Sequence, residues 1–243
     1  MAEDVDALPK GAGMWGQVVA GLLVVPALGF GLWAMGEAVG DTGGGPPRPA
    51  ACGDGETGGT PGKTRETRGR LSGDELCKAL NRPDLARLLG TPEEMATSAD
   101  GSDGSLKLAG AARDIATPTS EVRFATYTVT LSALYDGAPV AGYTPFTGHS
   151  AEERKVLGRP AVLYSDQTIS IRFRLDGSDA ETGPGVPARS VIVARDARDS
   201  GGSYEVTLWR GDGAVPDDAV LLRVAEAVLP TLPGWTPGSA VRP

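Results

Sequence analysis

The chain has 243 residues and carries 23 Lys and Arg against 31 Asp and Glu, a formal net charge of -8. This acidic balance argues against a nucleic-acid partner, because nucleic-acid binding relies on basic surfaces that neutralise phosphates. The hydrophobic share is 40%, with 35 Gly and 19 Pro. A chain of this size has room for one membrane span and one soluble domain with long connections.

The N-terminal region contains a long uncharged stretch. No residue between Lys10 and Glu37 is charged, and Trp15 and Trp33 lie near the two ends of this stretch. As a helix it would extend about 39 Å, enough to cross a hydrocarbon core of about 30 Å. Indole rings favour the headgroup boundary. We therefore predict a short N-terminal segment, 1–13, followed by a transmembrane helix, 14–36.

This stretch has two alternative interpretations. A cleaved signal peptide stays open, because residues 34–36 could serve as a small-residue cleavage site, but the apolar core exceeds the usual length of about 7 to 15 residues. Gly11, Gly13 and Gly16 have the G-x-G-x-x-G spacing of dinucleotide sites. No strand-like run precedes them and the following residues are apolar on every side, so we predict no dinucleotide site.

Residues 37–70 are rich in Gly, Pro, Thr and charge and lack apolar periodicity. Such a composition cannot bury enough surface to order the chain, so we predict a flexible linker. The run TGGTPGKT within it resembles a phosphate-binding loop, but Thr57 stands where the first glycine belongs and no strand precedes it. We predict neither a nucleotide nor another cofactor.

Orientation decides which compartment the domain faces. Lys10 lies on one side of the predicted span while Glu37 and Asp41 follow it, which favours a cytoplasmic N-terminus and an extracytoplasmic C-terminal domain. Cys52 and Cys77 are the two cysteines of the chain. They could form a disulfide in an oxidising compartment, or Cys77 could be a buried thiol, and the sequence leaves both alternatives open.

The folded domain, 71–243, is predicted to begin with helical segments. Ser72 and Glu75 have the spacing of a capping box, which predicts a helix that Pro83 ends. A second short helical turn follows and closes at Gly90.

The middle of the chain predicts a strand and then a short helix. EVRFATYTVTL, residues 121–131, is rich in β-branched and aromatic residues, with threonines alternating with apolar side chains. Capping-box spacing recurs at residues 150–153 and predicts a helix over 150–158. His149, the single histidine, has no nucleophile signature near it and is interpreted as a surface residue. One His and two Cys also argue against a transition-metal site.

Later segments predict more strands and a last helix. After a turn at Ser165 and Asp166, residues 169–175 alternate as a half-buried strand, and RSVIVARD and SYEVTLWRG predict an antiparallel hairpin. Four arginines of these strands are interpreted as cross-strand partners of Glu205 and the loop aspartates; they are Arg172, Arg174, Arg189 and Arg195. VPDDAVLLRVAEAVLPTLPGW predicts an amphipathic helix with Val220, Leu221, Val224 and Val228 buried.

Together these elements predict an α+β domain, an antiparallel sheet packed with N-terminal and C-terminal helices. LCKALNRPDLARLLGTPEE, RPAVLYSDQTISIRFRLDGSDAETGPG and PDDAVLLRVAEAVLPTLPGW resemble segments of an actinobacterial family of single-pass membrane proteins with an uncharacterised conserved domain. The resemblance implies a membrane location and no activity. More loosely, the fold is similar to PsbP-like domains of envelope lipoproteins.

The functional expectation is a membrane-anchored extracytoplasmic module that binds a protein or an envelope component and is not an enzyme. The alternatives are an extracytoplasmic hydrolase that uses carboxylates such as Asp176, Asp179 and Glu181, and a regulatory domain that faces the cytoplasm.

Overall fold

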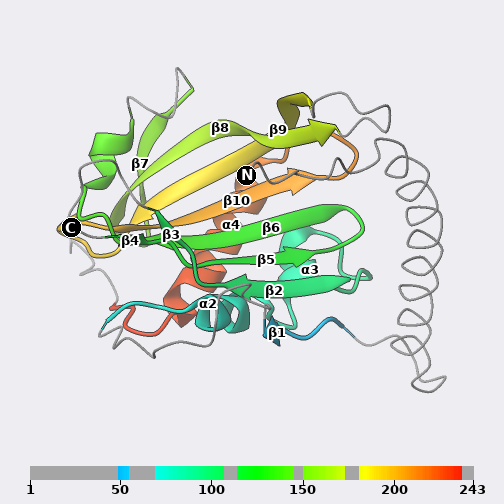
Figure 1. Cartoon of the computed structure of the whole chain (residues 1–243), viewed down its shortest axis with the longest axis horizontal. Coiled ribbons are helices and arrows are strands. Elements are labelled where there is room, and N and C mark those ends of the chain that lie inside the picture. Colours follow the sequence, from blue (N-terminus) through cyan, green and yellow to red (C-terminus); the bar gives the residue numbers. More distant parts are fainter. Residues whose placement is uncertain (1–48, 55–68, 107–113, 145–149, 173–180, 237–243) are drawn as a thin grey trace, which may run out of the picture. The chain divides into compact units, whose positions relative to one another are not determined.

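The computed structural model describes residues 49–54, 69–106, 114–144, 150–172 and 181–236 (Figure 1). The predicted helix at 14–36 and His149 lie outside these residues. Among the residues that are described, no helix has the length and apolar content that crossing a membrane needs. The elements in chain order are β1 (Gly53–Asp54), α2 (Gly73–Leu80), α3 (Leu85–Leu89), β2 (Ser98–Ser102), β3 (Ser105–Leu106), β4 (Ile115–Ala116), β5 (Thr119–Arg123), β6 (Tyr127–Leu134), η1 (Val140–Tyr143), β7 (Glu152–Val156), β8 (Arg159–Arg172), β9 (Glu181–Ala194), β10 (Ser203–Arg210), α4 (Asp218–Val228) and η2 (Leu229–Thr231).

The main sheet has the strand order β1-β2-β5-β6-β10-β9-β8-β7, and β3 and β4 form a separate pair. All neighbours in the main sheet are antiparallel except β1 and β2, which run parallel. Two runs of strands, β2-β5-β6 and β7 to β10, thus meet where β6 pairs with β10. The predicted α+β class and antiparallel sheet are confirmed.

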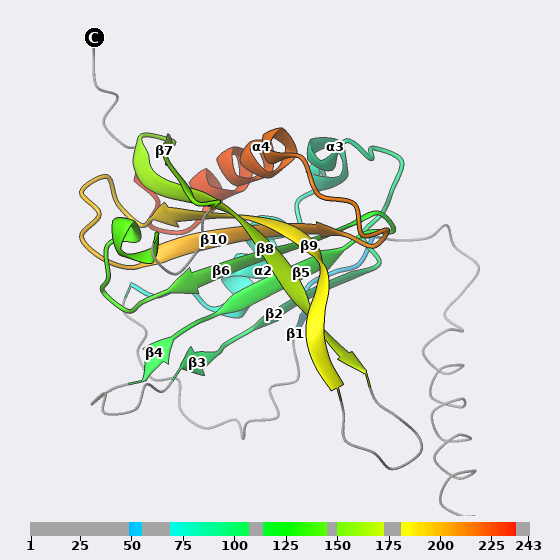
Figure 2. The same cartoon turned by 90° about the horizontal axis from the view of Figure 1, so that it is seen from above.

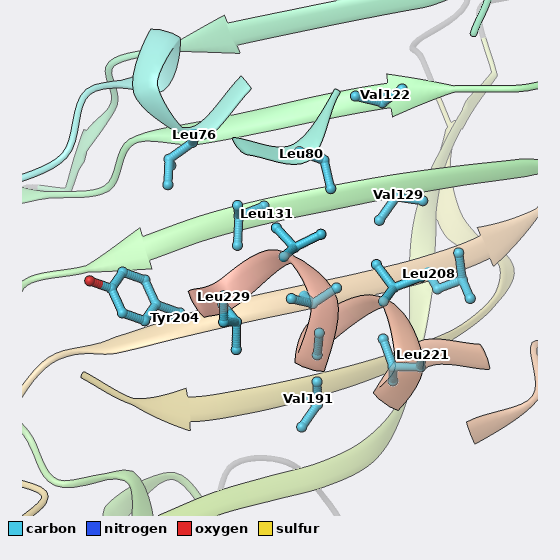
Figure 3. Close-up of a cluster of buried hydrophobic side chains, with 14 of the residues drawn as sticks. Leu76, Leu80, Val122, Val129, Leu131, Val191, Tyr204, Leu208, Leu221 and Leu229 are labelled. Atoms are coloured by element: carbon cyan, nitrogen blue, oxygen red, sulfur yellow. The ribbon is translucent and has the colours of Figure 1, made fainter. Parts of the chain in front are cut away.

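Among the described residues, α2, α3 and α4 pack on one face of this sheet, and Figure 2 shows α3 next to α4. Leu76 and Leu80 of α2 and Leu221 of α4 join Val129 and Leu131 of β6 in one hydrophobic cluster (Figure 3). Each of these five side chains is 0% exposed. Because full burial of one such side chain stabilises a fold by about 1.5 to 3 kcal/mol, this layer is the main source of stability.

Local signals at the start of the domain act as predicted. The Ser72 hydroxyl accepts from the Glu75 N–H at 3.2 Å, and the Glu75 carboxylate accepts from the Ser72 N–H at 2.8 Å, which completes the capping box. Gly90 ends α3 with a φ of 84°. The helix lies so close to β2 that a Cβ on Gly101 would be 2.2 Å from the Gly73 carbonyl oxygen. Glycine is therefore required at this contact.

Part of the segment predicted as a linker is attached to the domain. Residues 53–54 extend the sheet as β1, and the Ala50 N–H donates to the Ala96 carbonyl at 3.0 Å. The Asn81 side chain donates to the Ala50 carbonyl at 2.8 Å. The compact unit accordingly begins at Arg48. The boundary predicted from the sequence was residue 71. Composition alone hides this attachment, because the partners lie dozens of residues away.

A disulfide joins residues 49–54, which we call the arm, to α2. Cys52 and Cys77 are bonded, with their Cα atoms 5.9 Å apart. Cys77 is fully buried, and Cys52 packs against the main core. The bond therefore fixes residues 49–54 to α2.

The helix predicted for residues 150–158 is wrong. Glu152–Val156 is instead β7, which turns through Leu157 and Gly158, with φ of 52° and 77°, and pairs with the start of β8. Val156 is 1% exposed. Hairpin pairing and this burial outweigh the weak local capping signal, as tertiary packing often overrides propensity.

Two strand boundaries also differ from the prediction. The single strand predicted at 121–131 is the hairpin of β5 and β6, where the Phe124 N–H donates to the Tyr127 carbonyl at 2.7 Å. The turn predicted at Ser165 and Asp166 is absent, because β8 runs through it. Ile169, predicted on a buried face, is 79% exposed. At that point β8 and β9 extend beyond the ends of β7 and β10.

The C-terminal helix matches the prediction with one exchange. Leu221, Val224 and Val228 are buried as expected, whereas Val220 is partly exposed and Ala225 takes its place in the core. Arg189 does not pair across strands as predicted. Its guanidinium forms two contacts with Asp218 at the start of α4, at 2.5 and 2.8 Å, because residue 189 faces the helices.

Candidate functional site

The face of the sheet opposite the helices is polar and partly exposed. Residues on a strand alternate between the two faces, so the buried Val129 and Leu131 of β6 place the residues between and beside them on the opposite face. Register then extends this assignment across the neighbouring strands. We call the resulting surface the polar face, formed by Thr119, Glu121, Arg123, Thr128, Thr130, Ser132, Tyr164, Ser190, Glu205, Thr207 and Trp209.

Two side-chain pairs tie the strands of this face together. The Tyr164 hydroxyl of β8 donates to the Glu205 carboxylate of β10 and so crosses β9, which lies between these strands. Beneath it, the Ser190 and Thr207 hydroxyls lie 2.8 Å apart. Ser190 is 0% exposed, and Tyr164 lies opposite it on the neighbouring strand β8. The polar groups on this half of the face therefore bond to one another.

The Glu205 carboxyl is held in a desolvated place. Burial raises its pKa above the ordinary value, the hydrogen bond from Tyr164 acts in the opposite direction, and the nearby Asp166 charge raises it further. Burial, reinforced by Glu205, also raises the pKa of Tyr164 well above its usual range. The phenol accordingly keeps its proton at neutral pH and acts as a donor.

Replacing Glu205 with Gln should stabilise the domain at neutral pH by on the order of 1 kcal/mol. Because the folded-state pKa of Glu205 is raised, its stabilising contribution is complete below the unfolded pKa of about 4.3 and is lost as the pH rises through the folded value. The gain from E205Q should therefore vanish toward pH 4. Urea unfolding of both proteins between about pH 4 and 8 measures this.

Glu121→Gln provides the matched control, since this carboxylate belongs to the same face and pairs with an arginine whose side chain is 60% exposed. Its effect should stay within about 0.5 kcal/mol. A difference between wild type and E205Q that does not change with pH would contradict the burial of an ionisable Glu205.

The other half of the polar face holds hydroxyls that make no side-chain bond. Among the described residues, Thr128, Thr130 and Ser132 of β6 have no side-chain hydrogen-bond partner, and each is partly exposed. They lie between the pair formed by Glu121 and Arg123, 2.6 Å apart, and the Glu205 cluster. These hydroxyls are free to bond to a docked ligand, and a hydroxyl can both donate and accept.

One end of the polar face is closed by η1. Val140 of η1 forms a small second core with Val162 and Ile192. The Asp199 carboxylate accepts from the Val140 N–H at 2.8 and 2.9 Å, which holds η1 in place. The polar face is therefore bounded on the side of β7 and β8 and open toward β5 and β6.

Two further hollows flank the connection between α2 and α3, with volumes of about 410 and about 510 Å³. Their central charges are already paired: Arg82 donates to Asp84 and to the Ala227 carbonyl. At the rim of the larger hollow, Glu94 accepts from the backbone N–H and hydroxyl of Thr126. These groups hold the helices and the β5–β6 turn, so we assign the hollows a structural role.

The predicted site residues fall into two groups. Cys52 and Cys77 form the disulfide described above. Asp176 and Asp179 lie outside the described residues, as does the side chain of Glu181. Within the described part of the chain, no group of three or more His, Cys, Asp or Glu side chains could hold a metal ion.

Residues 9–150 match a family of unknown function, DUF6215, and this range is more than half of the chain. The chain belongs to the DUF6215 family. This match confirms the prediction that the chain belongs to a family with an uncharacterised domain. No curated protein and no solved structure matches the chain.

The DUF6215 match ends inside the structure. It contains β1 to β6 with α2 and α3, while β7 to β10 and α4 follow it. Five of the eleven residues of the polar face, Glu205 and Tyr164 among them, come from beyond the DUF6215 range. The sequence signal for the other half was the alternation of threonines in β6, but the cross-strand partners depend on the strand order.

Proposed function

We propose that this protein is a single-pass membrane protein whose extracytoplasmic domain binds a protein or envelope component and catalyses no reaction. In this proposal the N-terminus is cytoplasmic, residues 14–36 span the membrane, and the polar face is the surface on which the partner docks.

The observation that carries the binding proposal is the row of hydroxyls on β6. This strand lies at the centre of the sheet, where its neighbours β5 and β10 satisfy its backbone. Thr128, Thr130 and Ser132 nevertheless keep uncommitted hydroxyls at a partly exposed surface. A flat array of donors and acceptors flanked by charged groups suits a polar partner, and recognition by hydrogen bonds gives specificity.

The disulfide supports an extracytoplasmic location of the domain. Disulfides persist in oxidising surroundings and are rare where thiols are kept reduced, so a bonded Cys52 and Cys77 favour an extracytoplasmic domain. The family match begins at residue 9 and thus includes the predicted span. The resemblance to actinobacterial membrane proteins and to PsbP-like envelope domains belongs to this proposal as well.

Photo-crosslinking in intact cells should locate the partner. A photoreactive amino acid at Thr130 of the full chain should capture one envelope component, and the same group at Glu226 on the exposed side of α4 should not. Thr130→Arg in a chain that carries the crosslinker at Thr128 should reduce capture by about tenfold or more, since it places a bulky charge on the docking surface. Equal capture from both faces would refute the assignment of the polar face.

Thiol labelling tests the compartment separately. In intact cells, a membrane-impermeant reductant should open the bond, and a maleimide added after denaturation on ice, which exposes Cys77, should then label both cysteines. Without the reductant, the protein should remain unlabelled. Labelling of the unreduced protein only after lysis would instead support the cytoplasmic-facing regulatory domain.

A further inference from the structure

Among the described residues, no third strand pairs with the far end of the β8–β9 ribbon. β7 pairs with β8 only over residues 159–163, and β10 pairs with β9 only over residues 188–194. Residues 166–172 and 181–187 therefore project beyond the sheet as two strands (Figure 2). An isolated pair of strands is marginally stable in water, so a projecting ribbon gains from a further strand.

The two free edges of this ribbon differ in their protection. Proline at an edge removes a donor and discourages strand addition, and β9 carries Pro184 and Pro187. β9 is also bulged at Gly185, where a Cβ would lie 2.2 Å from the Thr168 hydroxyl oxygen. β8 carries neither proline nor lysine from residue 164 to 172. Its edge is the one open to another strand.

The backbone of β8 presents hydrogen-bonding groups to that edge. The Ser165 N–H points away from β9 and donates to the Ser150 hydroxyl at 3.3 Å. The Gln167 N–H, two residues on, donates to the adjacent Asp166 carboxylate at 2.7 Å, outside the strand ladder. Because alternate residues of a strand point the same way, the N–H and C=O of Ile169 also face the open edge. The Ile169 side chain is 79% exposed.

We propose that this edge of β8 pairs antiparallel with the same edge of a second copy of the chain, with the twofold axis at Ile169. In this register each Ile169 lies opposite its counterpart, and position 166, an aspartate, lies opposite position 172, an arginine. The segment is thus its own complement in charge as well as in backbone pattern. Strand addition of this kind satisfies the outward backbone groups and covers the exposed isoleucine.

A cysteine crosslink tests the register in the full chain, purified in detergent. The native cysteines are bonded to each other, so Ile169→Cys supplies the free thiol. Opposed residues in a hydrogen-bonded antiparallel pair have Cα atoms about 5.5 Å apart, within disulfide range. Mild oxidation should give a covalent dimer. Met95→Cys, at an apolar residue that is 43% exposed elsewhere, is the control and should give none.

The association itself is tested by sedimentation of the uncrosslinked chain. At about 50 µM the wild type should have the mass of two chains, and Ile169→Lys should raise the dimer dissociation constant at least about tenfold. Met95→Lys should leave it unchanged, and circular dichroism checks that both variants fold. A monomeric wild type, or crosslinking at residue 169 no faster than at residue 95, would overturn the proposal. The proposal would also be overturned if the β8 edge bound other proteins while this chain itself remained monomeric.

Discussion

A fragment that ends at residue 150, the end of the DUF6215 match, should not fold on its own. All eight residues of β6 pair with β10, and this partner would be missing. Leu131 of β6 would also lose Val206 and Leu208 of β10 and Leu221 of α4 from its cluster. The fragment would therefore expose both a central strand edge and half of the core, which favours aggregation. Circular dichroism and urea titration of residues 49–150 should show no cooperative unfolding transition.

Complementation provides the control for this prediction. Residues 151–243, added to the first fragment, supply β7 to β10 and α4 without cutting a described element. A cooperative transition should return in the mixture, because β6 and β10 then pair between the two fragments. A cooperative transition of residues 49–150 alone would show that the family range is an independent domain.

Removing the disulfide should have the second large effect. Cys52 and Cys77 are separated by 25 positions, and a crosslink that closes a loop of this size stabilises by about 3 to 4 kcal/mol in the chain-entropy account. Replacing both with Ser should lower the free energy of unfolding by that amount. Denaturant unfolding of the oxidised wild type and of the double variant measures the difference.

Asn81→Ala is the matched comparison, because it keeps the disulfide and removes the 2.8 Å hydrogen bond that holds Ala50, together with a 4.0 Å contact to the Cys52 sulfur. It should cost about 1 kcal/mol. Reduction of the wild type should reproduce the loss seen in the double serine variant. If the double variant were as stable as the oxidised protein, the arm would be held by its other contacts and the bond would add nothing.

The elements that the sequence predicts well are those whose signals are local. The capping box at Ser72 and Glu75 and the closing glycine at Gly90 operate within a few residues. The same holds for the C-terminal helix, whose apolar period directly selects Leu221, Val224 and Val228 for burial. In these segments local preference and the final packing agree, as is typical of natural sequences.

β7 shows where local signals fail. Its residues have the spacing of a capping box, but Val156 is needed in the core and the turn at Leu157 and Gly158 joins the strand to β8. Arg189 and Glu205 fail as a predicted pair for a related reason. They sit on opposite faces of the sheet, and only the register between β9 and β10 reveals this.

The candidate site could be predicted only in part. The alternating threonines of β6 are visible in TYTVTL, and they mark a strand with one wet face. The contact of Tyr164 with Glu205 joins residues 41 positions apart and passes over β9. It depends on the order β10-β9-β8, which local composition does not encode.

The Cys52–Cys77 bond also changes the covalent topology of the chain. Residues 53–76 become a closed ring, so one proteolytic cut between residues 55 and 68 leaves the two products joined through sulfur. A protease that cuts only within this ring therefore does not separate the domain from the residues before Cys52 until the bond is reduced as well. On the N-terminal side of the ring, hydrogen bonds attach Ala50 to Ala96 and to Asn81, and the disulfide attaches Cys52 to α2. The bond thus adds a covalent attachment, at Cys77, to the hydrogen bonds that hold residues 49–54 on the domain.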